Sequence, residues 1–136
     1  MLYLEEENIH MNKKIISTKK APKAIGPYSQ AILIGNTLYC SGQIALNPKT
    51  GMLVLDNIEE ETNQIMQNIS EILKEAKMDF SNVVKCSIFM RDIRDYESIN
   101  AIYTTYFNKY PPAREAIEVS KLPKNVNVEI SVISAK

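Results

Sequence analysis

The stretch from residue 58 to residue 76 carries the strongest periodic signal in the chain. Its side chains, nearly all apolar, recur at steps of three and four residues, the spacing of one face of an amphipathic α-helix. They are Ile58, Thr62, Ile65, Met66, Ile69, Ile72, Leu73 and Ala76. Asp56 followed by Glu59 predicts a capping start, and acidic residues in the first turn suit the helix dipole. A long amphipathic helix is therefore the first element that we expect.

Short runs rich in β-branched and aromatic residues occupy much of the remaining sequence and predict strands. Gly35-Asn36 lies between two such runs and is a two-residue hairpin signal. The Asn-Pro-Lys-Thr-Gly stretch at 47–51 predicts a second turn, after which residues 52–55 continue in extended form. The predicted strands cover residues 15–18, 28–34, 37–46, 83–90, 113–119 and 126–134.

A second helix is predicted to follow the strand at 83–90, starting near Asp92 or Asp95. It must end before Pro111-Pro112, because proline supplies no amide donor and disfavours helix at the residue before it. Its apolar side chains are Tyr96, Ile99, Tyr103, Tyr106 and Phe107. The order of hairpin, helix, strand, helix and two strands predicts an α+β domain, with two helices on one face of a mixed sheet.

The size and charge of the chain limit what it can do. Its 136 residues fit one domain, and we expect residues 13–136 to form it, with residues 1–12 as a frayed extension. Sixteen Lys and Arg residues balance sixteen Asp and Glu residues, so the broad positive field that draws proteins to nucleic acid is missing. No apolar run is long enough to span a membrane. The first residues fit neither a secretory signal nor a transit peptide, so we expect a cytoplasmic protein.

The sequence offers little to a metal ion. Cys40 and Cys86 belong to no CxxC motif or Cys/His cluster, and His10 is the only histidine. We expect two reduced, buried thiols, with a disulfide between them as the alternative. A zinc site would have to combine separated cysteines with carboxylates, so no metal site is expected.

Two charged residues stand out in the last two predicted strands, where side chains alternate between faces. Glu129 lies between Val128 and Ile130, so its side chain leaves the face opposite to theirs. Arg114 follows Pro-Pro-Ala, where backbone freedom is low, and its planar fork suits a bidentate grip on a carboxylate. The alternative is that both residues are solvated, or form a surface ion pair.

Other catalytic patterns are missing from the sequence. It contains no G-x-S-x-G elbow, no Walker loop and no H-E-x-x-H motif. Ser29 and Ser41 lack a histidine to activate them, because His10 lies in the extension. Residue patterns alone thus predict an α+β domain, and they leave open whether Arg114 and Glu129 form a pocket or are ordinary surface residues of their strands.

Five short motifs occur together in the order found in one known family. Each is weak alone, but together they make a specific match from about residue 13 to the C-terminus. They are AIGPYSQA at 24–31, SGQI at 41–44, NPKTG at 47–51, PPAR at 111–114, and the segment from LPK at 122–124 to VEI at 128–130. In these motifs the chain resembles the RidA/YjgF family of reactive-intermediate deaminases.

The resemblance implies a chorismate-mutase-like fold assembled as a homotrimer, with ligand clefts between neighbouring subunits. Members of the family hydrolyse enamines and imines, such as 2-aminoacrylate and 2-iminobutanoate, to 2-oxo acids and ammonia, and they use neither a metal nor an organic cofactor. Small 2-imino and 2-oxo acids are therefore the expected ligands. The family's site residues correspond to Tyr28, Ser41, Gly42, Asn100, Arg114 and Glu129.

The chain departs from the family pattern beside Arg114. Ala116 occupies a position where many members have cysteine or threonine, and Glu115 replaces the usual serine. The missing cysteine argues against a thiol-dependent mechanism. Strand alternation predicts that Glu115 faces away from Arg114, toward the pocket rim or a subunit contact.

The resemblance and the chemistry together assign roles to these residues. Arg114 would hold the substrate carboxylate, and Glu129 would orient or deprotonate water and return a proton to the departing ammonia. Tyr28 would wall the pocket, while Asn100 and the backbone at Ser41-Gly42 would hydrogen-bond the substrate or the water. Two other functions stay open: an endoribonuclease or translation inhibitor, and a non-catalytic metabolite-binding or chaperone-like module.

Overall fold

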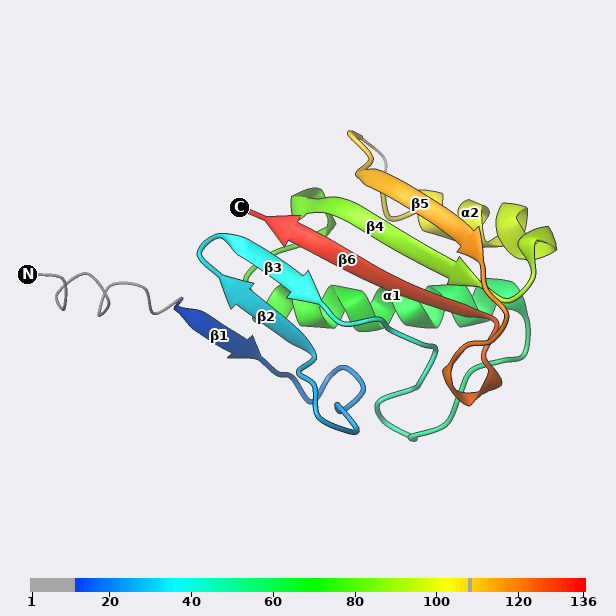
Figure 1. Cartoon of the computed structure of the whole chain (residues 1–136), viewed down its shortest axis with the longest axis horizontal. Helices are drawn as coiled ribbons and strands as arrows, with labels where there is room; N and C mark the ends of the chain where they lie inside the picture. The colour runs from blue at the N-terminus through cyan, green and yellow to red at the C-terminus, as the bar shows by residue number, and fades with distance from the viewer. Residues whose placement is uncertain (1–11, 108) are drawn as a thin grey trace, which may run out of the picture.

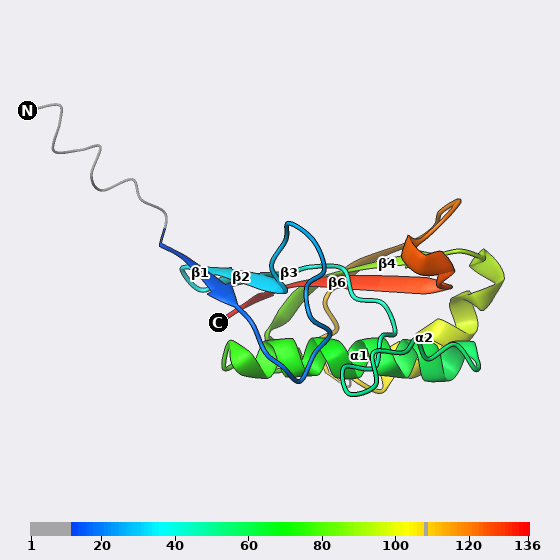
Figure 2. The same cartoon turned by 90° about the horizontal axis from the view of Figure 1, so that it is seen from below.

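In the computed structural model, which describes residues 12–107 and 109–136, the described residues form a six-stranded sheet with two helices against one of its faces (Figures 1 and 2). The strand order is β1-β2-β3-β6-β4-β5, with β4 and β5 parallel and all other neighbours antiparallel. The strands are β1 (Lys13–Ile16), β2 (Ala31–Ile34), β3 (Thr37–Cys40), β4 (Val83–Met90), β5 (Ala113–Glu118) and β6 (Val128–Ala135). The predicted mixed sheet with two helices on one face is confirmed.

The strands of the first hairpin are shorter than predicted, although their connection at Gly35-Asn36 is confirmed. β2 begins only at Ala31, which is in register with Ile16 and Cys40, the last residues of β1 and β3. β3 ends at Cys40, but the chain stays beside β6, its other neighbour in the sheet, through an isolated bridge between Gln43 and Ile130. This irregular segment after β3 forms part of the candidate site.

The first helix, α1 (Ile58–Glu75), confirms the predicted amphipathic stripe. Ile65, Met66, Ile69 and Ile72 are completely buried against the sheet. The predicted cap at Asp56 is wrong by one residue: the extended backbone of Asn57 lets its side-chain oxygen accept a hydrogen bond of 2.8 Å from the Glu60 N–H.

The second helix, α2 (Tyr96–Thr104), starts at the second of the two predicted positions. A single 3₁₀ turn, η3 (Ile93–Asp95), precedes it and is capped by the Asp92 carboxylate. α2 ends before the prolines at 111 and 112, as predicted, and it packs beside α1 at the β5 edge of the sheet (Figure 1).

The two faces of the sheet differ sharply. Along β6, Val128, Ile130 and Val132 are buried beneath the helices, and Glu129 lies on the other face. Neither α1 nor α2 covers that second face (Figure 2), which we call the open face. Tyr39 lies on this face and is 51% exposed.

Both cysteines are free and buried, so the expectation of two reduced thiols is confirmed. Burial raises the pKa of the Cys40 thiol to about 12, which keeps it protonated. Within the described residues, no helix has the length and apolar character needed to cross a bilayer. His10 and the predicted extension lie outside the described residues, apart from Asn12.

Candidate functional site

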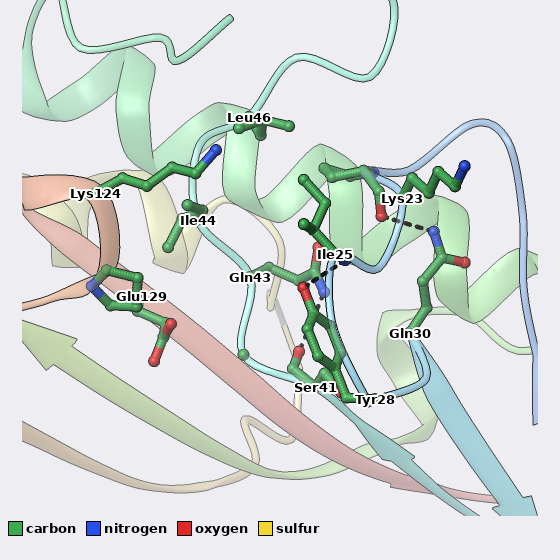
Figure 3. Close-up of a pocket in the computed structure, with 13 residues that line it drawn as sticks. Lys23, Ile25, Tyr28, Gln30, Ser41, Gln43, Ile44, Leu46, Lys124 and Glu129 are labelled. Carbon is green, nitrogen blue, oxygen red and sulfur yellow. Dashed lines mark hydrogen bonds between the residues drawn. The ribbon is translucent and has the colours of Figure 1, made fainter. Parts of the chain in front are cut away.

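A cavity of about 490 Å³ lies between the loop that precedes β2, the segment after β3 and the start of β6 (Figure 3). Four of the predicted site residues line it: Tyr28, Ser41, Gly42 and Glu129. Its other walls are largely apolar, from side chains such as Ile25, Ile44 and Leu46, with Lys124 at its rim.

Glu129 supplies the carboxylate of this cavity. It projects from the open face of β6, and Figure 3 shows its carboxylate directed into the space between the surrounding loops. No protein donor within residues 12–107 and 109–136 hydrogen-bonds this carboxylate. Burial therefore raises the pKa of Glu129, because the charged form has lost water without gaining a partner. Such a carboxylate is a stronger base than one in water.

Gly42 makes room for that carboxylate. A Cβ atom built on Gly42 would lie 2.9 Å from Cδ and 3.0 Å from Oε2 of Glu129, closer than real Cβ contacts. The backbone hydrogen bonds between Gln43 and Ile130, of 2.8 and 3.1 Å, fix Gly42 beside β6. The absence of a side chain at Gly42 thus lets the Glu129 carboxylate lie directly against the backbone. In the described part of the chain the Gly42 N–H finds no acceptor, which leaves it available to a ligand.

The hydroxyl groups of Ser41 and Tyr28 are both engaged by the protein. Ser41 donates its hydroxyl hydrogen to the Ser29 carbonyl oxygen at 2.6 Å, and its N–H donates to the Gln30 carbonyl oxygen at 2.9 Å. The Tyr28 hydroxyl accepts from the Ile25 N–H at 3.2 Å, and its ring walls the cavity. Ser41 therefore ties two chain segments together and cannot offer its hydroxyl proton to a substrate without breaking that bond.

Two buried amide side chains hold the cavity walls in place, and sequence reasoning missed both. Gln30 accepts from the Thr18 N–H at 2.7 Å and donates to the Pro22 carbonyl oxygen at 2.8 Å. Asn68 of α1 donates to the Leu46 carbonyl oxygen at 2.9 Å. Asn68 lies within the apolar stripe of the predicted helix, and a buried amide there is a signal that could have been noticed.

Arg114 belongs to a different cluster, formed with α2. From β5 its Nη1 donates to Asn100 Oδ1 and its Nη2 donates to the Tyr96 hydroxyl, both at 2.7 Å. The guanidinium carbon lies 4.8 Å from the centre of the Tyr103 ring and 5.6 Å from that of Tyr96. A second cavity, of about 330 Å³, opens beside Arg114 and Asn100. The structure thus brings these two predicted residues together.

Arg114 and Glu129 do not meet within one chain. Arg114 is in register with Cys86, which faces the helices, whereas Glu129 is in register with Phe89 on the open face. The two side chains leave opposite faces of the sheet, and the described residues contain no ion pair between them. The interpretation as a surface ion pair is therefore wrong for a single copy, and one copy alone cannot present both groups to one small ligand.

Glu115 lies where strand alternation predicts. It faces away from Arg114, accepts a hydrogen bond of 3.2 Å from Ser87 and pairs with Lys85 at 3.4 Å. Ala116 returns to the helix side, half-buried against the core. The described residues contain no group of three or more His, Cys, Asp or Glu side chains placed to hold a metal ion.

Comparisons with known proteins identify the family. The family model described as endoribonuclease L-PSP matches residues 18–136. The 2-iminobutanoate/2-iminopropanoate deaminase of Bos taurus is 49% identical over 124 residues, which cover 91% of this chain and 90% of that protein. A putative regulator AldR of Lactococcus lactis is 53% identical, covering 89% of this chain and 96% of the relative.

Solved structures agree with the sequence relatives. The crystal structure of the YjgF gene product from E. coli has a TM-score of 0.87 at 38% identity and covers 90% of this chain and 98% of that one. A putative endoribonuclease from Thermotoga maritima has a TM-score of 0.89 at 41% identity, with 90% and 97% covered. The chain therefore belongs to the RidA/YjgF family, also described as the endoribonuclease L-PSP family.

Proposed function

We propose that this protein hydrolyses reactive 2-imino acids and their enamine tautomers, such as 2-iminobutanoate and 2-aminoacrylate, to 2-oxo acids and ammonia. The single observation that carries the proposal is the Glu129 carboxylate, held beside Gly42 in a largely apolar cavity with no protein partner in the described chain. The deaminase names of relatives about half identical in sequence support the same reaction.

The reaction needs a base that can return its proton. Glu129 accepts a proton from water as the water oxygen bonds to the C=N carbon, and it passes this proton to the imine nitrogen, which becomes an amine. The resulting carbinolamine then collapses: Glu129 takes the hydroxyl proton as the C=O bond forms and passes it to the amine nitrogen, the C–N bond breaks, and ammonia leaves. Water is consumed and no electrons are transferred, so positioning and acid–base help are sufficient.

Arg114 is the proposed carboxylate-binding residue of the same reaction. Asn100 and Tyr96 already fix the orientation of its guanidinium group. Arg114 therefore loses little conformational entropy when it binds a carboxylate. Because Arg114 and Glu129 leave opposite faces of one sheet, the proposal requires Arg114 of one copy to meet Glu129 of another. A homotrimer, whose subunits cover one another's open faces, provides that arrangement and buries exposed side chains such as Tyr39.

The decisive experiment measures release of ammonia and 2-oxobutanoate from freshly generated 2-iminobutanoate. We expect the protein to exceed the spontaneous hydrolysis rate in proportion to its concentration, and Glu129→Gln protein to stay near the spontaneous rate. Binding of 2-oxobutanoate without turnover would favour the metabolite-binding module instead. RNA cleavage in the absence of imine turnover would favour the endoribonuclease.

Light scattering tests the assembly. We expect about three subunit masses, with the count taken from the family resemblance. A monodisperse monomer at micromolar concentration would contradict the shared site, because a monomer keeps Arg114 and Glu129 on opposite faces.

A further inference from the structure

Tyr96, the first residue of α2, lies between Arg114 and solvent. Its hydroxyl oxygen accepts the 2.7 Å hydrogen bond from Arg114 Nη2, and its ring lies 5.6 Å from the guanidinium carbon. Tyr96 is 38% exposed, and its hydrogen bond with Arg114 lies at the surface, so a small ligand that binds the guanidinium on this exposed side also meets the hydroxyl. The sequence places Tyr96 only in the apolar stripe of the second helix.

The hydrogen-bond capacity of Tyr96 is only half used. A phenol accepts through its oxygen and donates one proton. Its oxygen accepts from a cation, so its own proton must point away from the guanidinium, and it meets no acceptor among the residues that the structure describes. A hydroxyl that accepts a charge-assisted hydrogen bond becomes a better donor, because hydrogen bonds in a chain polarise one another.

Arg114 presents free donors beside that hydroxyl. Its two recorded hydrogen bonds use one N–H on each terminal nitrogen, so each nitrogen keeps a second N–H. An anion with two oxygens can thus accept from Arg114 and from the Tyr96 O–H at once. A neutral amide presents only one acceptor oxygen together with an NH₂ donor, which would oppose the donors of the protein.

We propose that the Tyr96 hydroxyl is a second hydrogen-bond donor to the substrate carboxylate, acting beside Arg114, and that it increases the selection of 2-imino acids over their neutral amides. This inference rests on the proposed function, which assigns the carboxylate to Arg114. Tyr103 does not share this role: its ring also lies against Arg114, but its hydroxyl is buried and away from solvent.

The test compares an acid and its amide on two proteins. Tyr96→Phe keeps the ring beside Arg114 and removes only the hydroxyl. Calorimetry with 2-oxobutanoate and 2-oxobutanamide gives the ratio of the two affinities for each protein. We expect Tyr96→Phe to weaken binding of the acid about tenfold, with the amide nearly unchanged. For 2-iminobutanoate turnover, KM should rise about tenfold while kcat stays within twofold.

Tyr106→Phe is the matched control. It removes a hydroxyl just beyond α2 that donates to Asn63 and not to the Arg114 cluster, and both affinities should stay at the wild-type values. Melting temperatures of all variants show whether each is folded.

The possible failures are distinguishable. If Arg114→Lys reduces the acid-to-amide ratio and Tyr96→Phe leaves it unchanged, Tyr96 does not contact the carboxylate, and the proposed function still stands. Equal losses for acid and amide in Tyr96→Phe would show that Tyr96 only supports the local structure. If neither variant changes the ratio, the carboxylate is not bound at Arg114, and the proposed function loses that assignment.

Discussion

Two clusters of the molecule hold a charged side chain in opposite ways. The Glu129 cluster consists of Ser41, Gly42, Gln43 and Glu129, and the Arg114 cluster consists of Tyr96, Asn100, Tyr103 and Arg114. Glu129 is positioned by backbone hydrogen bonds and by the close approach of a glycine, and its carboxylate has no protein partner in the described chain. Arg114 is positioned by its own charged end, which donates to two side-chain acceptors and lies over an aromatic ring.

This difference suits the Glu129 cluster to reaction and the Arg114 cluster to binding. A charge without partners in a half-buried cavity is unstable and therefore ready to accept a proton, as the raised pKa of Glu129 indicates. A cation with acceptors already in place is stable, directional and ready to bind an anion. The two clusters thus suit the two tasks that imine hydrolysis requires, proton transfer and the holding of a carboxylate.

The sharpest test of the contrast is Glu129→Gln. It preserves the shape of the side chain and removes the base, so kcat for 2-iminobutanoate should fall by roughly 10²–10⁴. Binding of 2-oxobutanoate should survive, because the Arg114 cluster is untouched. Steady-state kinetics and calorimetry on the same preparation measure both quantities. Equal losses in turnover and in affinity would assign Glu129 a structural role at the subunit boundary.

Gly42→Ala disturbs the position of Glu129 and leaves its chemistry intact. The added Cβ would lie within 3 Å of the carboxylate, which must move aside on its flexible stem. We expect kcat/KM to fall by up to about 10², the cost of misplacing a catalytic group by an ångström. The melting temperature should change little. Full activity in this variant would show that the contact with Gly42 does not set the working position of the carboxylate.

Arg114→Lys tests the other cluster. Lysine keeps the charge but loses the planar fork, so its ammonium cannot reproduce the directions in which the guanidinium reaches Asn100, Tyr96 and a carboxylate. We expect kcat/KM to fall about tenfold or more, with a parallel loss of 2-oxobutanoate affinity. Ala116→Cys, on the same strand face, should leave the reaction largely intact. An unchanged kcat/KM in Arg114→Lys would show that Arg114 is an ordinary strand residue with no part in substrate binding.

The smallest effect concerns stability. Burial raises the pKa of Glu129 in the folded protein above its unfolded value, so the ionised carboxylate destabilises the fold at pH above both values. Glu129→Gln should therefore melt at a higher temperature than the wild type at pH 7. This gain should disappear as the pH falls below about 4, where the carboxyl is protonated in both states. Calorimetric scans from pH 3 to 8 measure the trend. A lower melting temperature at pH 7 would contradict an unpaired carboxylate and would point to an ion pair between Glu129 and Arg114 of another copy.

The sequence predicts the Glu129 cluster better than the Arg114 cluster, for a physical reason. Strand alternation assigns Glu129 to a face, because side chains on a strand have a period of two and Val128 and Ile130 must be buried. The same rule places Arg114 on the face opposite to Glu115. It does not reveal that Arg114 and Glu129 leave opposite faces of one sheet, because that depends on the register of β5 and β6 with β4, a long-range property.

The sequence pattern also does not reveal the two side chains that accept hydrogen bonds from Arg114. Asn100 comes only from the family resemblance, and Tyr96 is indistinguishable from a core residue until the start of α2 is known. The cap of α1 shows the same limit on a smaller scale, since Asp56 and Asn57 are both suitable residues and only the backbone angles of Asn57 decide between them.

The bridge between Gln43 and Ile130 also has a dynamic consequence. Ile130 directly follows Glu129 in β6, a central strand of the sheet, and its two backbone hydrogen bonds with Gln43 attach the cavity wall to the strand that carries the carboxylate. The Gln43 segment and the strand that carries Glu129 therefore move together, which keeps the distance between the cavity wall and the carboxylate constant during thermal motion. The Gln43 amide should exchange its hydrogen with solvent as slowly as the amides of β6, although it lies in a segment without regular structure.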